Sequence, residues 1–478
     1  MKKNLLLCAA LCAASAAWAE APASVTISGE ALAEEASVEC TKVDDGKFEA
    51  FALLNGGKTL TATGGDLNLT VTPGTKGVYR ITVDGNANTI GIKKIEYMAI
   101  RQNWTQNEFI LSYAGNGSWS GTFNWGELSA SDNRYLIALH YVRDDQRAYM
   151  FAPENGTDAT PDGSDNYFYM KDTGKVRNKR DDDPADIELG QWADRVWWKV
   201  SGDIQAGTKP YVCTVTMRGE HFTHSFAECE AAPATLGATG SALAEGSSFA
   251  FNKVNDFTYE LFTKLKPGDL TISDGTNSYV IDGYKLKQEA GSTAISEEGV
   301  YCININFANK AASLKQVTSV KIFHLMSFGP IGESLEYKET GIWSSNVDIP
   351  AGDDRYRFEM VLDGEYQQWG PTISGLDSAP NDNPEYFNLK RVPWTYWNNK
   401  YKFDGAVKGQ NSPVTLKFNA FPYVHNFAAY TVSGVESVEA DENAPVEYYN
   451  LQGMRVENPA NGLYIRRQGN HATKVLVK

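Results

Sequence analysis

The sequence lacks the motifs on which most enzyme active sites are built. Its 478 residues contain no H-E-x-x-H zinc motif, no G-x-S-x-G nucleophile elbow and no phosphate-binding loop. The six histidines are scattered, and their spacing is not that of metal ligands. Gly117–Gly121 reads G-S-W-S-G, with tryptophan in the place of the nucleophile. The sequence therefore predicts a protein that is not an enzyme and that carries no cofactor or metal.

The sequence has little basic charge and no second long apolar run. Residues 1–19 are predicted to be a signal peptide, because Lys2 and Lys3 precede an apolar stretch that ends in the cleavage site Ala17-Trp18-Ala19. Beyond it, no run reaches the ~18 apolar residues of a membrane helix, so no transmembrane span is expected. The formal charge of −15 argues against a nucleic-acid partner. We expect an exported protein that is soluble outside the cell or attached to the cell surface.

Cysteine is also scarce, and its positions do not form a disulfide framework. Cys8 and Cys12 each follow a leucine, whereas lipid attachment requires a small residue there, so simple cleavage after Ala19 is favoured. The mature chain keeps four cysteines, none of which recurs in the internal repeat: Cys40, Cys213, Cys229 and Cys302. Buried free thiols are expected, although export also permits a Cys213–Cys229 bridge.

An internal repeat organises the chain. Seven short segments of the first half recur in the same order in the second half. The pairs are Ala31–Glu34 with Ala242–Glu245, Lys42–Asp44 with Lys253–Asn255, Gly77–Tyr79 with Gly299–Tyr301, Gly117–Ser120 with Gly341–Ser344, Asp132–Tyr135 with Asp353–Tyr356, Tyr167–Phe168 with Tyr386–Phe387, and His224–Phe226 with His425–Phe427. The order never breaks, which predicts two modules over about 22–230 and 232–430.

The hydrophobic pattern predicts an all-β fold. Tyr135 to Tyr141 and Tyr356 to Leu362 alternate with period two, which is typical of half-buried antiparallel strands. Turn signals such as Asp84-Gly85 and Asp363-Gly364 separate the strands, and helical patterns are rare. We therefore predict tandem immunoglobulin-like β-sandwiches in two repeated modules, followed by a small C-terminal β-domain.

Each module is too large for one typical sandwich, so we divide it in two. The predicted boundaries are 1–19 for the signal peptide, 20–112 and 113–230 for the two sandwiches of the first module, 231–336 and 337–432 for those of the second, and 433–478 for a linker and C-terminal sorting domain.

Two arginines recur at an outward position of the repeated strand. Arg134 and Arg355 precede the core residues Tyr135 and Tyr356, and period two points them away from the core. A guanidinium fork can donate hydrogen bonds to vicinal sugar hydroxyls. A surface arginine or a structural salt bridge is the alternative.

Aromatic residues supply the other candidates, because flat rings stack on sugar faces. Trp119, Trp198 and Trp343 are predicted to lie in the cores, and Trp197 to face outward. Pro393 and Asn398-Asn399 flank the segment of Trp394 and Trp397, and Trp369 precedes a glycine, so loops are expected there. The predicted counterparts in the first module are Trp192 for Trp394 and Tyr149 for Trp369. The alternative for all of them is core or inter-domain packing.

Two loops are rich in oxygen ligands. Residues 158–166 and 377–383 contain Asp, Asn, Pro and Gly, which suits calcium in general but does not match EF-hand spacing. We expect ordinary solvated loops.

The ordered motifs resemble the SusE/SusF family of starch-utilisation outer-membrane proteins. In the second module the resemblance rests on Tyr259 to Gly268, Gly299–Tyr301, Gly341–Ser344, Asp354–Phe358, Trp369-Gly370, Tyr386-Phe387, and Tyr423 with His425. The resemblance covers most of the chain and fits the second module better. It implies tandem sandwiches that hold starch or related glycans through aromatic platforms with Arg, Lys or Asn, without catalysis. Family members are typically lipoproteins, and this sequence has no convincing lipidation motif.

The C-terminal segment is similar to the sorting domain of type IX secretion. Val446–Gly453, Asn461–Ile465 and Lys474–Lys478 give a strand-turn-strand pattern, and the acidic stretch 436–442 is typical of a linker. The resemblance implies passage across the outer membrane and attachment to the surface. A small appended β-domain is the alternative.

The main hypothesis is a non-catalytic glycan-binding surface protein. Its partner would be a polysaccharide or oligosaccharide, and association with an outer-membrane glycan transporter is left open. A surface adhesin or structural β-protein that binds other proteins is the alternative. An extracellular glycoside-active enzyme is a third hypothesis, because sequence alone does not exclude a pair of suitably spaced carboxylates.

Overall fold

The computed structural model describes residues 21–103, 107–127, 132–142, 144, 147–154, 169–179, 181–190, 196–327, 329–352, 354–373, 377–379, 387–392, 400–430, 445–450, 454–460, 462–468 and 471–477. Over these residues the fold is nearly all β, which confirms the predicted class. The helical elements among them are α2 (Gly202–Gln205) and the 3-10 turns η1 (Trp125–Glu127) and η2 (Ala185–Ile187). No helix in the described ranges is long and apolar enough to cross a membrane. Residues 1–428 form one compact unit and 429–478 another.

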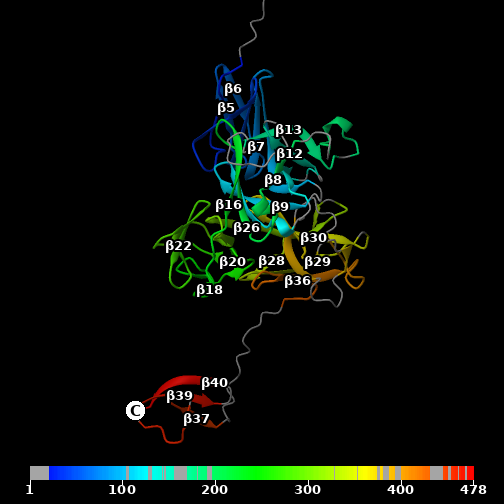
Figure 1. The fold of residues 1–478 in the computed structure, drawn as a ribbon. Helices are drawn as coiled ribbons and strands as arrows, with labels where there is room; N and C mark the ends of the chain where they lie inside the picture. Colours follow the sequence, from blue (N-terminus) through cyan, green and yellow to red (C-terminus); the bar gives the residue numbers. More distant parts are fainter. Residues whose placement is uncertain are drawn as a thin grey trace, which may run out of the picture. The chain divides into compact units, whose positions relative to one another are not determined.

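The first sandwich of the first module contains the blue strands of Figure 1. They are β1 (Thr26–Ser28), β2 (Ser37–Glu39), β3 (Thr41–Asp44), β4 (Lys47–Leu54), β5 (Leu60–Gly64), β6 (Leu67–Val71), β7 (Gly77–Asp84) and β8 (Thr89–Gln102). One sheet has the order β2-β1-β5-β6, and β3, β4, β7 and β8 pair in the other. The side chains of Ile27, Phe48, Leu60 and Ile81 are at most 1% exposed and form the core between the sheets.

The second sandwich of the first module is closed by hydrogen bonds. Besides β8 it contains β9 (Glu108–Gly115), β10 (Ser118–Phe123), β11 (Arg134–Tyr141), β12 (Ala148–Pro153), β13 (Tyr169–Arg177), β14 (Trp198–Lys199), β15 (Tyr211–Thr216) and β16 (Phe222–Glu228). The pairing of β8 with both β9 and β11 turns the order β8-β9-β10-β15-β16-β13-β12-β11 into a ring. Trp119, Tyr135 and Trp198 are at most 2% exposed inside it, as predicted for the core.

The second module repeats this plan in green to orange (Figure 1). Its first sandwich contains β17 (Gly237–Thr239), β18 (Ser248–Ala250), β19 (Asn252–Lys253), β20 (Thr258–Leu265), β21 (Gly268–Ser273), β22 (Ser278–Asp282), β23 (Lys285–Gln288), β24 (Thr293–Ile295), β25 (Gly299–Asn306) and β26 (Ala311–His324). Its second sandwich adds β27 (Gly329–Ile331), β28 (Glu336–Glu339), β29 (Ile342–Asp348), β30 (Arg355–Leu362), β31 (Glu365–Pro371), β32 (Asp377–Ser378), β33 (Asn388–Val392), β34 (Lys400–Lys402), β35 (Asn411–Lys417) and β36 (Tyr423–Asn426). Trp343 is 3% exposed in this core, as predicted.

One long strand joins the two sandwiches of each module. The strands β8 and β26 both have 14 residues. The first half of β8 pairs with β7 and the second half with β11, while β26 pairs in the same way with β25 and β30. Each pairing with the second sandwich contains a register shift, where the strand turns from one core to the next. The predicted boundaries at 112 and 336 stay predictions, and β8 and β26 contribute to both sandwiches.

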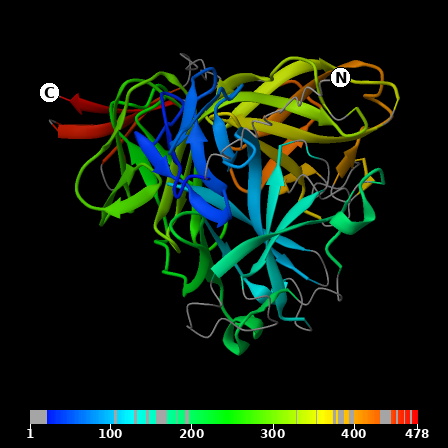
Figure 2. The same ribbon diagram turned by 90° about the horizontal axis from the view of Figure 1, so that it is seen from above.

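The two modules contact each other over a surface that includes the outer faces of their second sandwiches. Tyr97 and Ala99 of β8 form one buried cluster with Phe323 and Leu325 of the second module, and β8 also contacts β31. Figure 2 gives a second view of the two modules, the first coloured from blue through cyan to green and the second from green to orange. The prediction that β11 and β30 are half-buried is therefore wrong. Both faces of β11 are buried, because the second module covers the outer one.

A charged cluster lies in this contact. The Glu108 carboxylate accepts hydrogen bonds from Arg101 at 2.6 Å, His140 at 3.1 Å and the Tyr97 hydroxyl at 3.1 Å. Burial alone would raise the pKa of Glu108, but His140 and Arg101 outweigh it and hold the pKa at about 2. The charges that are buried on this face of β8 are therefore paired with one another.

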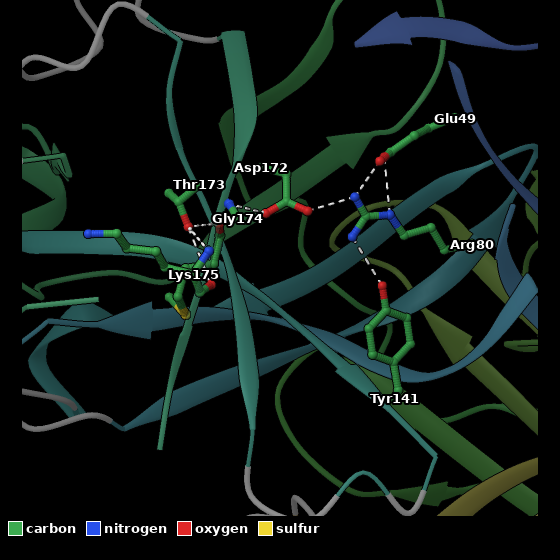
Figure 3. A network of polar contacts seen from close by, with 8 residues as sticks. Glu49, Arg80, Tyr141, Asp172, Thr173, Gly174 and Lys175 are labelled. Carbon is green, nitrogen blue, oxygen red and sulfur yellow. Dashed lines mark hydrogen bonds and ion pairs between the residues drawn. The ribbon is translucent and has the colours of Figure 1, made fainter. Parts of the chain in front are cut away.

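A second charged cluster joins the two sandwiches of the first module (Figure 3). Arg80 of β7 donates to Glu49 of β4, to Asp172 of β13 at 2.6 Å and to the Tyr141 hydroxyl of β11 at 3.1 Å. Its side chain is 11% exposed. Burial raises the pKa of Glu49, although Arg80 pulls it down. One guanidinium thus satisfies acceptors from both sandwiches.

The four cysteines that the structure describes are all free thiols, so the Cys213–Cys229 bridge does not form. Cys40, Cys213 and Cys302 are buried and Cys229 is partly buried. Burial, with smaller effects of Glu39 and Glu49, raises the pKa of Cys40 to about 12. The thiols are therefore packing residues.

The C-terminal unit is a single small sheet. Its strands are β37 (Val446–Tyr449), β38 (Arg455–Val456), β39 (Gly462–Gln468) and β40 (His471–Val477), in the order β38-β37-β39-β40. Leu463 and Leu476 face each other across β39 and β40 and are 40% and 64% exposed. No side chain whose burial is described in this unit is fully buried.

We predict that Arg80→Met lowers the free energy of unfolding by about 3–5 kcal/mol at pH 7, because Glu49 and Asp172 would lose their buried cation. The loss should shrink toward pH 5, where protonation of Glu49 removes the uncompensated charge. Urea denaturation followed by tryptophan fluorescence measures both. Lys58→Met is the control, since Lys58 and Glu30 form an exposed pair. An equal effect of the two variants would contradict the role of Arg80.

Candidate functional site

Two of the predicted surface aromatics are buried. Trp369 is 4% exposed, because β31 continues past it to Pro371 and pairs on both sides with β30 and β33. Its ring lies edge-on to Phe418, with the ring centroids 5.0 Å apart. The predictions that Trp369 stands on a loop and belongs to a sugar platform are therefore wrong. The glycine that follows it lies within the strand.

Trp197 is also buried, at 2% exposure, so the outward orientation predicted for it is wrong. It precedes the two-residue strand β14, and the predicted alternation does not extend to it. The Arg134 guanidinium lies 5.6 Å from the centroid of its ring. The buried Trp197 ring therefore packs against the Arg134 guanidinium, and Trp197 does not itself form a binding surface.

The strand register also corrects one repeat assignment. Trp369 faces Phe358 in β30, and the equivalent position facing Ile137 in β11 is Phe151. Phe151, and not Tyr149, is therefore the counterpart of Trp369, and both are buried.

Tyr149 lies at the far end of the hairpin from Arg134. It pairs with Leu139, five residues along β11, which is roughly 17 Å at the strand rise. Its hydroxyl donates to Asp144 at 2.7 Å and accepts from Lys93 at 2.9 Å. Burial and the bond to Asp144 raise the pKa of Tyr149, so the hydroxyl stays neutral. The structure therefore does not bring Tyr149 and Arg134 into one site.

The predicted arginines stand in equivalent places, each opposite a lysine. Arg134 of β11 pairs directly with Lys199 of β14, and Arg355 of β30 pairs with Lys402 of β34. We call these two the opposed basic pairs. All four side chains are half-buried. Like charges directly opposite each other in an antiparallel ladder repel, and both modules repeat this arrangement.

An acidic neighbour moderates each pair. Arg134 donates to the Asp132 carboxylate at 3.1 Å. In the second module Asp354 precedes Arg355 and accepts from Lys408 at 2.8 Å. Both ion pairs are part-buried, and the one in the first module includes Arg134 of the opposed basic pair itself.

A buried aromatic layer supports each opposed basic pair. The rings of Tyr135 and Trp198 stack with centroids 5.7 Å apart, and those of Tyr356 and Tyr401 with centroids 5.3 Å apart. The hydroxyls of Tyr135 and Tyr356 lie 2.8 and 2.9 Å from Nε2 of His224 and His425. The recurring Arg-Tyr and His motifs are thus one structural assembly in each module.

His425 is held as the neutral imidazole. Its Nδ1–H donates to the Phe387 carbonyl at 3.0 Å, which leaves Nε2 to accept from Tyr356. Burial lowers the pKa of His425 to about 3, against the opposing effect of the hydrogen bond to Phe387.

Trp192, Trp394 and Trp397 lie outside the described residues. Their segments continue directly into the strands of the opposed basic pairs, since residues 393–399 precede β34 and residues 191–195 precede Val196 to Lys199. Of the predicted oxygen-rich loops, residues 158–166 also lie outside the described part, and only 377–379 of the other loop are described. Among the residues that the structure covers, no group of three His, Cys, Asp or Glu is placed to hold a metal ion.

The lysines of the opposed basic pairs, and two clefts described below, were missed by sequence reasoning. Lys199 and Lys402 come from strands of two and three residues, which are too short for period two to detect. Their recurrence after an aromatic-rich segment is the signal that a closer alignment of the two modules would have used.

Comparison with known proteins adds one structure. No protein-family model and no curated protein matches this chain. The crystal structure of SusF from Bacteroides thetaiotaomicron aligns over 84% of this chain and 91% of that chain, with 11% sequence identity and a TM-score of 0.25. With identity and TM-score this low, the functional argument rests on the geometry of this chain.

We predict that Trp369→Ala lowers the free energy of unfolding by about 3–5 kcal/mol, as is usual for removal of a buried tryptophan side chain. Trp369→Phe should cost clearly less, because phenylalanine occupies the equivalent core position at Phe151. Thermal unfolding of the two variants measures the difference. A Trp369→Ala variant that keeps wild-type stability would contradict the buried position of Trp369.

We predict that the stability of the second module falls as the pH drops from about 6.5 toward 3. The folded pKa of His425 is depressed below the unfolded value of about 6.5, so the unfolded state binds the proton first and is favoured in this range. His425→Gln should flatten this dependence, whereas the neighbouring Asn426→Ala should keep it. Urea denaturation at half-unit steps of pH measures the slope, and an unchanged slope in His425→Gln would refute the assignment.

Proposed function

We propose that this protein binds a polysaccharide without cleaving it, and that the opposed basic pairs form part of its binding sites. The observation that carries the proposal is the recurrence of Arg opposite Lys in both modules. In each pair a half-buried arginine and a half-buried lysine lie directly opposite each other on neighbouring strands, so that one ligand can reach both.

The chemistry of the pairs suits sugar hydroxyls. Arginine presents up to five donors in a rigid fork, and lysine presents three on a flexible stem. The aromatic layer and the short strands hold the Cα positions, so little order has to be gained on binding. The nearby carboxylates Asp132 and Asp354 already accept hydrogen bonds from cations of the protein. This arrangement favours holding a saccharide over hydrolysing it.

The aromatic contribution to these sites rests on Trp192, Trp394 and Trp397. Chain continuity supports it, because each tryptophan lies within a few residues of a strand that carries one of the lysines. Export, surface location and a sorting role for the C-terminal sheet are proposed from the sequence features of the two ends. Association with a glycan transporter is proposed on the resemblance alone.

The test is electrophoretic retardation in native gels that contain starch, xylan or mannan. We expect retardation by at least one polysaccharide and at least about tenfold weaker binding for Arg355→Ala/Lys402→Ala, since loss of even one hydrogen bond to a charged group costs about 1.5–3 kcal/mol and about 1.4 kcal/mol is a factor of ten. Lys285→Ala, an exposed lysine on β23, is the matched control. The first-module variant Arg134→Ala/Lys199→Ala shows whether both modules bind.

Three outcomes would overturn the proposal. Release of reducing sugar from the retained polysaccharide would show an enzyme. Equal retardation of Arg355→Ala/Lys402→Ala and Lys285→Ala would place the site elsewhere. Absence of retardation in every gel, together with binding to a purified protein, would favour the adhesin.

A further inference from the structure

A cleft lies between the first and second sandwich of each module, at equivalent positions. The cleft of the first module has a volume of about 690 Å³ and that of the second about 630 Å³. Both values fall within the range typical of small-molecule sites, which often lie at domain interfaces. We call them the first and second junction clefts.

The strand registers establish the equivalence. Val38 pairs with Ile27 in the first module as Phe249 pairs with Ala238 in the second. On the opposite wall, Val215 pairs with Trp119 as Leu416 pairs with Trp343. Counting onward from these pairs, Glu39 corresponds to Ala250 and Arg218 to Asn419.

One hydrogen-bond pattern holds the walls of both clefts together. The Glu34 carboxylate accepts from the Tyr113 hydroxyl at 2.6 Å, and Glu245 accepts from Tyr337 at 2.8 Å. Each glutamate accepts a further bond from the next turn, at 3.2 Å from the Asn116 amide in one module. In the other module, the Thr340 hydroxyl donates at 3.0 Å. This contact explains the repeated Ala-Leu-Ala-Glu motif and keeps both clefts pre-formed.

The linings of the two clefts differ in charge. The first junction cleft is crossed by an ion pair between Glu35 and Arg218 and by a second contact between His221 and Glu154 at 3.1 Å. Further charged residues line it: Glu39, Lys42 and Glu220. The Glu35–Arg218 ion pair joins the two walls of this cleft, and Glu154 is paired with His221.

The second junction cleft has lost that ion pair. Gly246 stands where the first module has Glu35, Asn419 where it has Arg218, and Ala250 where it has Glu39. The half-buried ring of Phe249 stands in place of Val38. The cleft is thus open, with an apolar base of Leu261, Phe262 and Phe418.

Polar groups surround this apolar base. The carboxylates of Glu245 and Glu339, the hydroxyl of Thr340, and the amides of Asn252 and Asn419 line the cleft. Aromatic rings combined with amide and carboxylate groups suit a sugar ring, which has an apolar face and a rim of hydroxyls. Two carboxylates with no lysine or arginine in the lining disfavour an anionic sugar.

An exposed phenylalanine lies in the turn that forms one wall. Phe421 is 49% exposed and follows Asn419 by two residues. Its ring contacts Tyr423 edge-on, with centroids 5.5 Å apart, which limits its movement. A large apolar side chain held in solvent beside a cleft is typical of a binding surface.

We infer that the second junction cleft is an additional saccharide site, selective for neutral sugar units, and that the first junction cleft is not. The inference rests on the proposed function of the chain as a glycan-binding protein. The second module would then have a saccharide site distinct from its opposed basic pair, and it would hold a polysaccharide at two points.

The experiment uses the full mature chain in which both opposed basic pairs are replaced by alanine. Residual binding to starch, xylan and mannan is measured by gel retardation, with polygalacturonate as the anionic probe. One further substitution is then introduced into this variant, either Phe249→Ala or Asn419→Arg, of which Asn419 is the exposed position. We expect each to weaken the residual binding by about three- to tenfold. Arg218→Asn, the reciprocal substitution in the first junction cleft, should leave the residual binding unchanged. Polygalacturonate should not bind.

The outcomes separate the two proposals. No residual binding in the chain without basic pairs, or residual binding that both cleft variants leave intact, would overturn the cleft assignment while the proposed function stands. Binding of polygalacturonate that is lost in Phe249→Ala, which leaves the charge of the cleft unchanged, would overturn the neutral selectivity. No binding of any polysaccharide by the wild-type chain would overturn both proposals. Thermal unfolding checks that the Phe249→Ala variant is folded. The Asn419→Arg variant tests the cleft assignment independently, from an exposed position.

Discussion

The hydrogen bond between a glutamate of one sandwich and a tyrosine of the next is the contact on which each module depends. Glu34 with Tyr113, and Glu245 with Tyr337, join segments about 80 to 90 residues apart in the chain. The shared strands β8 and β26 make the same connection covalently. Together they turn two sandwiches with separate cores into one body, so that a cleft between them has a fixed shape. The closely similar contacts give both modules the same junction geometry.

Burial of paired charge is the second constraint. Arg80 donates to acceptors from both sandwiches of the first module, and Glu108 accepts hydrogen bonds from Arg101 and His140 beside the contact between the modules. Each group would be costly if left alone in the interior, and each is therefore held by partners from several strands. These clusters explain why outward faces of strands carry charge and are still buried.

Much of the fold could be predicted from the sequence, whereas little of the site could. Period two, turn residues and the internal repeat predicted strands, modules and the buried positions of Trp119, Trp198 and Trp343. The same reasoning failed for Trp197 and Trp369, because a two-residue strand and a strand that continues through glycine leave no reliable pattern. Arg134 and Arg355 were found by recurrence, but the lysines opposite them were not, since residues from separate strands meet only through sheet pairing.

The sequence by itself determined the all-β class and the duplication, because strand periodicity and repeated motifs are local properties of the chain. Only the tertiary structure decided which outward faces are buried, which tryptophans lie in the cores, and where the clefts are. Those properties depend on contacts between residues far apart in sequence, such as Tyr97 with Phe323, or the equivalent walls that Val38 and Phe249 provide. Whether a surface is buried depends on which other part of the protein covers it, and no local sequence pattern carries that information.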